Sequence, residues 1–330
     1  MSIIRIATSN DTVSRARAQA VAASLTSTGQ AECEVVTAEF TPASVREALI
    51  SGEIDVIVVS AAELGEPDPR ITVASYLKRA DSRDVLCARD DLIFDTLAPG
   101  AHVAVTSARR AAQVRARRPD LECEIMASDT EELLALLAEG GADAVVVSAA
   151  DVDRLGRLDA ITEYLGNDGW PTSPGQGSTA LLVRTEPEKS GVGKSIRSLN
   201  HGPTRTIVEA ELGIKDRLGD AGDLLGAHGI IDDGLLFMSA RVYRPDGADK
   251  VTSSHALYVA DVANPVRDIA DRVATELRSM GARDIAAGTS TLPAAEVDAD
   301  GAPNADADGA PDAETKRAPS PTNTAVRGSE

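Results

Sequence analysis

The order of apolar and polar positions in the first part of the chain switches repeatedly between a strand period and a helix period. Short apolar runs at 3–7, 34–36 and 55–59 predict strands, and helix signals fill 12–26 and 42–52 between them. Such alternation is typical of βαβ units around a mostly parallel sheet. The pattern therefore predicts an α/β fold.

One segment of this pattern occurs twice. Residues 55–64 (DVIVVSAAEL) return as 143–152 (DAVVVSAADV), and the helices that precede them also match. Convergent use of good helix and strand residues would explain a short match, but the shared helix, strand and Ser-Ala-Ala order favours two similar doubly wound lobes. Ligands of such sheets bind beyond the carboxyl ends of the strands, which here means around Ser60 and Ser148.

The pattern changes after about residue 200. A helix is predicted over 204–218, then an antiparallel hairpin of 235–243 and 255–260, then a helix over 264–280. From residue 288 the chain becomes rich in Ala, Asp, Pro and Gly, with too little apolar area to offset chain entropy. An aspartate-rich calcium loop is the alternative there, but the required spacing and the closing glutamate are missing, which favours a solvated acidic tail.

We expect the chain to have four parts. They are a first α/β lobe (1–80 plus 176–198), a second α/β lobe (81–175), a small C-terminal α+β domain (199–287), and a disordered acidic tail (288–330).

Composition and charge exclude several classes of protein. With 33 Lys+Arg against 52 Asp+Glu the formal charge is −19, which argues against nucleic acid or an anionic membrane as a partner. Only 2% of residues are aromatic, so a base-stacking surface is not expected. No apolar run has the length of a membrane span, and the start lacks the pattern of a signal peptide. A cytoplasmic, monomeric protein is expected, and the scattered cysteines and histidines predict no metal site.

Several segments in order resemble the porphobilinogen deaminase (hydroxymethylbilane synthase) family. They are Arg5-Ile-Ala-Thr8, Arg83-Asp84, Thr106-Ser-Ala-Arg-Arg110, Arg117-Arg-Pro-Asp-Leu121, Arg154-Leu-Gly156, Gly175-Gln-Gly177, Leu199-Asn-His201, Glu209-Ala-Glu211, Arg217-Leu218 and Gly281-Ala-Arg283. Their order and nearly gapless spacing over 3–285 carry the resemblance. It implies two α/β lobes around a cleft, plus an α+β domain whose cysteine holds a dipyrromethane cofactor through a thioether. Family members join porphobilinogen units head to tail and release ammonia.

The resemblance also implies candidate site residues. Each pyrrole carries two carboxylates, which arginine forks bind well, and Arg109 and Arg110 match the family's paired arginines. Adjacent arginines in an acidic protein are otherwise solvated or paired with acids, but their Thr-Ser-Ala-Arg-Arg context favours a ligand site with hydrogen bonds from Ser60 and Thr106. Glu63 occupies the position of the catalytic aspartate, where its extra methylene displaces the carboxylate by about 1 Å.

Other parts of the family pattern are missing. The segments 9–14 and 127–133 lack the family's arginines, the lid before the second helix is deleted near residue 36, and the cysteine loop (219–226) contains no cysteine. No covalently held dipyrromethane is therefore expected.

The three remaining cysteines are predicted to be core residues. Cys33 and Cys123 lie in Glu-Cys-Glu strands, where nearby carboxylates are expected to raise the thiol pKa, and Cys87 lies in an apolar strand.

Three functions remain open from the sequence. The first is a deaminase-like protein of tetrapyrrole biosynthesis whose transferase activity is impaired or lost, because key catalytic positions are substituted. The second is a non-catalytic binder of a pyrrole carboxylate or another small polycarboxylate anion. The third, a solute-binding protein on the same two-lobe plan, has no export signal to support it.

Overall fold

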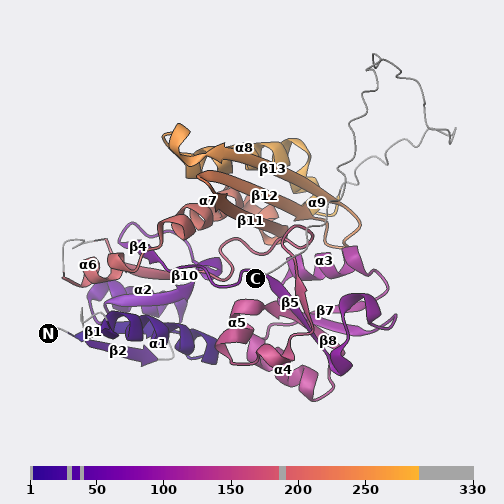
Figure 1. Ribbon diagram of the computed structural model, residues 1–330, viewed down its shortest axis with the longest axis horizontal. Coiled ribbons are helices and arrows are strands. Elements are labelled where there is room, and N and C mark those ends of the chain that lie inside the picture. Colours follow the sequence, from indigo (N-terminus) through magenta and orange to yellow (C-terminus); the bar gives the residue numbers. More distant parts are fainter. Residues whose placement is uncertain (1–2, 28–31, 38–40, 186–190, 290–330) are drawn as a thin grey trace, which may run out of the picture. The chain divides into compact units, whose positions relative to one another are not determined.

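Strands and helices build two five-stranded sheets and one smaller sheet in the computed structural model (Figure 1). The structure describes residues 3–27, 32–37, 41–185 and 191–289. From residue 290 onward, the predicted tail lies outside the described residues, and so do residues 38–40 at the predicted lid deletion.

The first lobe is a sheet in the order β2-β1-β3-β10-β4, in which β10 is antiparallel to both neighbours. Its strands are β1 (Ile3–Thr8), β2 (Glu32–Thr37), β3 (Val56–Ser60), β4 (Ile71–Tyr76) and β10 (Thr179–Arg184), and its helices are α1 (Thr12–Ser27), α2 (Pro42–Ser51) and α6 (Gly191–Ser198). Buried side chains of α1 and α6 share one apolar cluster with the sheet, and those of α2 belong to another. Helices thus cover both faces, as the doubly wound pattern predicts.

The ends of α1 and α2 follow from local chemistry. The Asp11 carboxylate accepts a hydrogen bond of 2.8 Å from the Ser14 backbone N–H at the start of α1. Thr41 caps α2 ahead of Pro42, whose missing N–H costs nothing in a first turn. Gly52 ends α2 with a φ of 83°, a left-handed conformation that favours glycine.

The second lobe repeats this plan in the order β7-β6-β8-β5-β9, with β5 as the antiparallel strand. Its strands are β5 (Asp84–Ala88), β6 (His102–Val105), β7 (Glu122–Ile125), β8 (Ala144–Ser148) and β9 (Glu163–Leu165), and its helices are α3 (Ala108–Arg117), α4 (Thr130–Ala138) and α5 (Ala149–Arg154). The two copies of the repeated segment form β3 and β8, which are the central strands of their sheets. The prediction of two similar lobes is confirmed.

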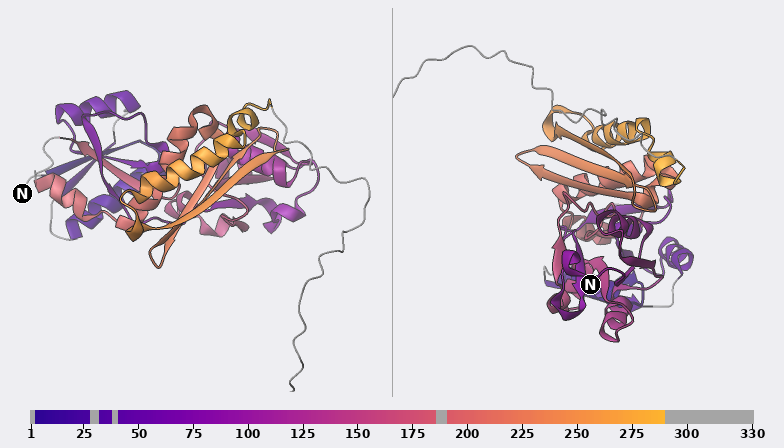
Figure 2. Two further views of the ribbon diagram at one scale, coloured as in Figure 1. Left: turned by 90° about the horizontal axis from the view of Figure 1, so that it is seen from above. Right: turned by 90° about the vertical axis from the view of Figure 1, so that its right-hand side faces the viewer.

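The third part is an antiparallel sheet, β11-β12-β13, with α7 packed on β11 and α8 on β13 (Figure 2). The elements are α7 (Gly202–Leu218), β11 (Leu225–Asp232), β12 (Leu235–Tyr243), β13 (Lys250–Tyr258), α8 (Pro265–Ser279) and α9 (Ala282–Ala286). The predicted hairpin is confirmed as β12 and β13. Strand β11 was not predicted, because its two glycines weaken the strand pattern. Gly226 is required there, since a Cβ would lie 2.5 Å from the Pro171 carbonyl oxygen.

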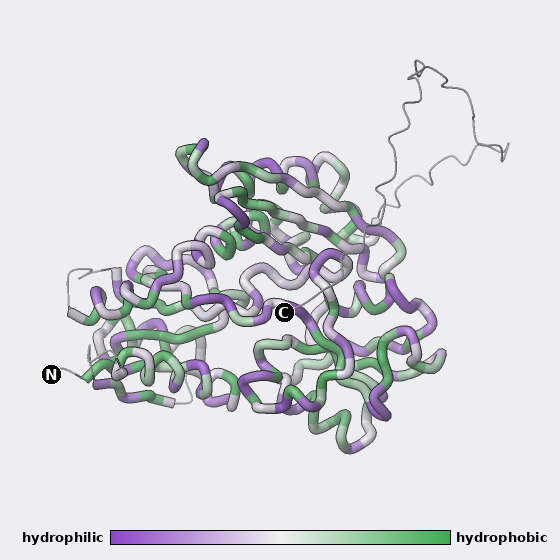
Figure 3. Tube along the Cα trace, in the orientation of Figure 1, coloured by the Kyte–Doolittle hydropathy of each residue, from purple (hydrophilic) through white to green (hydrophobic). Residues whose placement is uncertain are grey.

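Short 3₁₀ helices complete the fold. They are η1 (Ala61–Glu63), η2 (Arg89–Asp91), η3 (Phe94–Thr96), η4 (Leu158–Ala160), η5 (Gly219–Leu224) and η6 (Val259–Asp261). Figure 3 shows hydrophobic and hydrophilic segments alternating along the coloured part of the trace, and β5 and β8 are buried at every position. Among the described helices, none is both long enough and apolar enough to cross a membrane.

Candidate ligand-binding site between the two lobes

A pocket of about 650 Å³ is lined by residues of both α/β lobes. Its wall includes the ends of β3 and β8 at Ser60 and Ser148, and the turn that follows β6 at Thr106. The five residues singled out from the sequence all line it: Ser60, Glu63, Thr106, Arg109 and Arg110. Carboxyl ends of central strands therefore meet at this pocket, as expected for sheets of this type.

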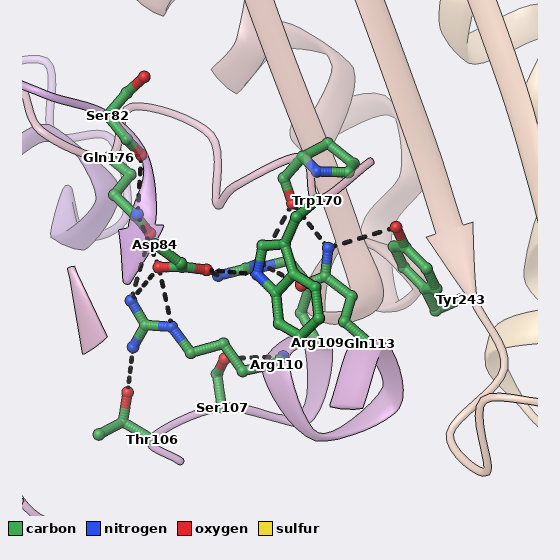
Figure 4. Close-up of polar contacts among 11 residues, drawn as sticks. Ser82, Asp84, Thr106, Ser107, Arg109, Arg110, Gln113, Trp170, Gln176 and Tyr243 are labelled. Carbon is green, nitrogen blue, oxygen red and sulfur yellow. Dashed lines mark hydrogen bonds and ion pairs between the residues drawn. The ribbon is translucent and has the colours of Figure 1, made fainter. Parts of the chain in front are cut away.

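Arg109 and Arg110 both point at the fully buried carboxylate of Asp84, the first residue of β5 (Figure 4). Arg109 Nη2 lies 2.9 Å from Asp84 Oδ2, and Arg110 Nη2 lies 2.7 Å from Oδ1. Trp170 Nε1 and Gln176 Nε2 donate further hydrogen bonds of 3.0 and 2.8 Å to the same carboxylate. We call Asp84, Arg109 and Arg110 the Asp84 cluster.

Other donors of the two arginines also have partners within the protein. Arg110 Nη1 donates to Thr106 Oγ1, and Arg109 Nη1 donates to Gln113 Oε1 and to the Pro171 carbonyl oxygen. Burial raises the pKa of Asp84, but the charges of Arg110 and Arg109 outweigh it and hold the pKa below its usual range. The arginines that the sequence assigns to a ligand are thus already bound to an acid of the protein.

A second group of charges spans the two lobes. Arg17 on α1 of the first lobe lies 3.5 Å, Nη2 to Oδ1, from Asp151 on α5 of the second lobe. Arg154 Nη1 lies 3.2 Å from the same Oδ1 atom. All three residues line the pocket. We call them the Asp151 cluster.

Three buried polar atoms of the pocket wall have no hydrogen-bond partner among the described residues. They are Arg17 Nε, Ser148 Oγ and Ser178 Oγ. A buried polar group without a partner costs roughly 1–3 kcal/mol, and a ligand that pairs with it removes that cost. All three atoms belong to residues that line the pocket.

Arg17 was not predicted as a site residue, although the sequence holds a signal for it. The buried face of α1 consists of Val13, Ser14, Arg17, Ala18, Val21 and Leu25. An arginine on the apolar face of a helix needs a charged or polar partner inside the protein. Arg154 carried a signal too, because it belongs to one of the segments that resemble the family.

Glu63 lies on η1, directly after β3, and it is an exposed residue of the pocket wall. The protein packed around the carboxyl group raises its pKa by desolvation. The charge of Arg17 acts in the opposite direction, and the carboxylates of Asp151 and Asp11 raise the pKa further. Glu63 therefore holds its proton to a higher pH than an ordinary glutamate.

The three cysteines lie in strands β2, β5 and β7, as predicted, and none lines the pocket. Burial raises the pKa of Cys87 to about 12 and that of Cys123 to about 11. The expected cause at Cys33 and Cys123, repulsion by neighbouring carboxylates, is wrong, because burial is the dominant contribution at both.

The segment that corresponds to the family's cysteine loop belongs to the third domain. Residues 219–224 form η5, and Ala221 and Leu224 are buried in the core of that domain. No residue of 219–226 lines the pocket as the structure describes it. In the described part of the chain, no group of three His, Cys, Asp or Glu residues has a geometry that could hold a metal ion.

The fold and the site together define a class of protein in which two α/β lobes share a charged pocket and an α+β domain follows them. The chain belongs to the porphobilinogen deaminase family: residues 39–191 match the family model described as "Porphobilinogen deaminase, dipyromethane cofactor binding domain". The chain is 42% identical over 253 residues to a porphobilinogen deaminase of Leifsonia xyli subsp. xyli. The aligned residues cover 74% of this chain and 77% of the relative.

Two further relatives extend this similarity. A porphobilinogen deaminase of Thermobifida fusca is 36% identical over 228 residues, covering 68% of this chain and 71% of the relative. A porphobilinogen deaminase of Acidothermus cellulolyticus is 30% identical over 303 residues, covering 86% of this chain and 90% of the relative.

Proposed function

We propose that the pocket between the lobes binds a pyrrole that carries carboxylates, and that the family reaction, head-to-tail polymerisation of porphobilinogen with loss of ammonia, is impaired or lost. The observation that carries the proposal is that the pocket wall holds four arginines but no thiol. The arginines suit a carboxylated pyrrole, whereas a covalent primer needs a thiolate.

The ligand contacts follow from the pocket wall. Thr106 and Ser60 supply hydroxyl groups from the two lobes, and Arg109 and Arg110, which are both paired with Asp84, add positive charge to the pocket wall. The Asp84 cluster has two positive charges and one negative charge, so one formal positive charge remains for a ligand carboxylate.

The properties of Glu63 support the proposal that the reaction is impaired. A carboxylate must stabilise the cationic azafulvene that forms when ammonia leaves, and it does so only in its ionised form. Burial raises the pKa of Glu63, which lowers the fraction of ionised carboxylate at a given pH. The longer side chain and the raised pKa both act against catalysis.

The second candidate, a non-catalytic binder of another small polycarboxylate, is favoured by the charge of the pocket. Its four arginines are matched by four acids (Asp11, Glu63, Asp129 and Asp151), so the formal charge of the wall is 4 − 4 = 0. A growing chain of pyrroles carries two more carboxylates with each unit, and such a pocket does not offset that charge. A single small ligand suits it better than a chain.

Intact-mass spectrometry of the protein from a host that makes porphobilinogen tests the first proposal. We expect the mass of the polypeptide alone and no rescue of a deaminase-deficient strain. A two-pyrrole adduct, above all on Cys33, Cys87 or Cys123, together with rescue, would contradict it. A cytoplasmic location and a monomeric state stay predictions from the sequence.

A further inference from the structure

We propose that Arg17, together with Ser148 and Arg154, forms a carboxylate-binding subsite that joins the two lobes. The inference rests on the proposed function, because the subsite would take one carboxylate of the pyrrole proposed above. It is distinct from the Asp84 cluster, and it assigns a role to a residue of α1 that no sequence motif marks.

The first argument is the state of the Arg17 side chain. It is 6% exposed, and among the described residues its Nε has no hydrogen-bond partner and its one ion pair, with Asp151, has an Nη2 to Oδ1 distance of 3.5 Å. Charge-assisted hydrogen bonds of arginine are usually 2.7–2.9 Å long, and a bidentate pair uses two parallel N–H groups. Arg17 is therefore held inside the protein with its hydrogen-bonding capacity largely unused.

The second argument is the charge of the Asp151 cluster. The buried guanidinium group of Arg17 and the half-buried one of Arg154 share one oxygen atom of one carboxylate, which leaves one formal positive charge. Burial lowers the pKa of Arg154, and the repulsion from Arg17 lowers it further. A ligand carboxylate would supply the missing negative charge.

The third argument is Ser148. It is 4% exposed, it ends β8 just before the helix that carries Asp151 and Arg154, and it lines the pocket with a buried Oγ that has no partner among the described residues. A hydroxyl group can donate to the second oxygen of a carboxylate that Arg17 holds. Since Arg17 belongs to the first lobe and Ser148 to the second, the bound anion would connect the lobes.

Titration calorimetry of the full chain at pH 7 tests the subsite, with porphobilinogen and succinate as separate probes. The variants are Arg17→Gln, which removes the charge, and Arg17→Lys, which keeps the charge but loses the fork. Arg15→Gln is the matched control, because Arg15 is an exposed arginine on the same helix. We expect Arg17→Gln to weaken binding of porphobilinogen roughly ten- to a hundredfold, Arg17→Lys to be intermediate, and Arg15→Gln to stay within about twofold.

The outcomes separate the subsite from the proposed function. Equal affinity of Arg17→Gln and the unchanged protein for porphobilinogen would overturn the subsite and leave the pyrrole proposal standing. If the unchanged protein binds succinate but not porphobilinogen, and Arg17→Gln no longer binds succinate, the subsite is supported and the proposal of a pyrrole ligand is overturned. Absence of binding to either probe would overturn both. A melting temperature of Arg17→Gln equal to that of Arg15→Gln shows that any lost binding is not a folding defect.

Discussion

The Asp84 and Asp151 clusters have the same composition, one aspartate with two arginines, but their surroundings differ. Asp84 is fully buried and accepts hydrogen bonds from both arginines, a tryptophan and a glutamine. Asp151 is 26% exposed, and its two arginine contacts are 3.2 and 3.5 Å long. One cluster is closed by protein partners and the other is open to a ligand.

The difference follows from the position of each cluster in the fold. Asp84 starts β5, an inner strand, and its partners come from α3 and from residues 170–176, where the chain returns toward the first lobe. Charges buried so deeply persist only when every partner is present. Asp151 lies on a short helix at the wall between the lobes, where a bound molecule can supply the partner.

The largest expected effect is on stability. Asp84→Asn leaves two buried guanidinium groups without their counter-charge, which typically costs about 3–5 kcal/mol, whereas Asp151→Asn should cost less than about 1 kcal/mol. Urea unfolding followed by circular dichroism measures both values. Equal losses in the two variants would show that the clusters do not differ as described.

A smaller effect is expected on binding. Asp151 competes with a ligand carboxylate for Arg17, so Asp151→Asn should tighten binding of porphobilinogen by about fivefold, which corresponds to about 1 kcal/mol. Calorimetric titration of the variant beside the unchanged protein gives the ratio. Weaker binding in Asp151→Asn would mean that the carboxylate orients Arg17 rather than competing for it.

The smallest effect concerns the pH dependence of stability at Glu63. Because the folded protein raises the pKa of this acid, the native state binds its proton more tightly than the unfolded state. The resulting destabilisation is absent below the unfolded pKa and develops as the pH rises from there through the folded pKa. Glu63→Gln should therefore raise the melting temperature at pH 7 and leave it nearly unchanged at pH 4.

Thermal unfolding at both pH values checks this, with Glu66→Gln as a control, because Glu66 is an exposed glutamate outside the pocket. If Glu63→Gln raised the melting temperature more at pH 4 than at pH 7, the pH dependence would have the opposite sign, and desolvation of Glu63 would be excluded as its cause.

The fold was predictable from the sequence wherever local pattern determines structure. The repeated helix and strand order located β3 and β8, and with them Ser60 and Ser148 at one pocket. Strand β11 was missed because the need for Gly226 arises from Pro171, 55 residues away along the chain. The local pattern of apolar and polar residues carries no information about a contact between residues so far apart.

The site was predictable only in part, and for a related reason. The motif around Arg109 and Arg110 located the pocket, but their partner Asp84 lies about 25 residues away and only the folded chain brings them together. The position of Arg17 on the apolar face of its helix indicates that it needs a partner, but its burial against the second lobe is a tertiary property that the sequence does not show.

The most direct test of the contrast between the two clusters is a titration of ¹⁵N-arginine-labelled protein with porphobilinogen, followed through the Nε–H signals by NMR. The account predicts the largest shift at Arg17, whose Nε gains a partner, and the smallest at Arg109, whose two Nη groups are already paired within the protein. An Arg17 signal that stays unmoved at saturation, while Arg109 shifts, would contradict it.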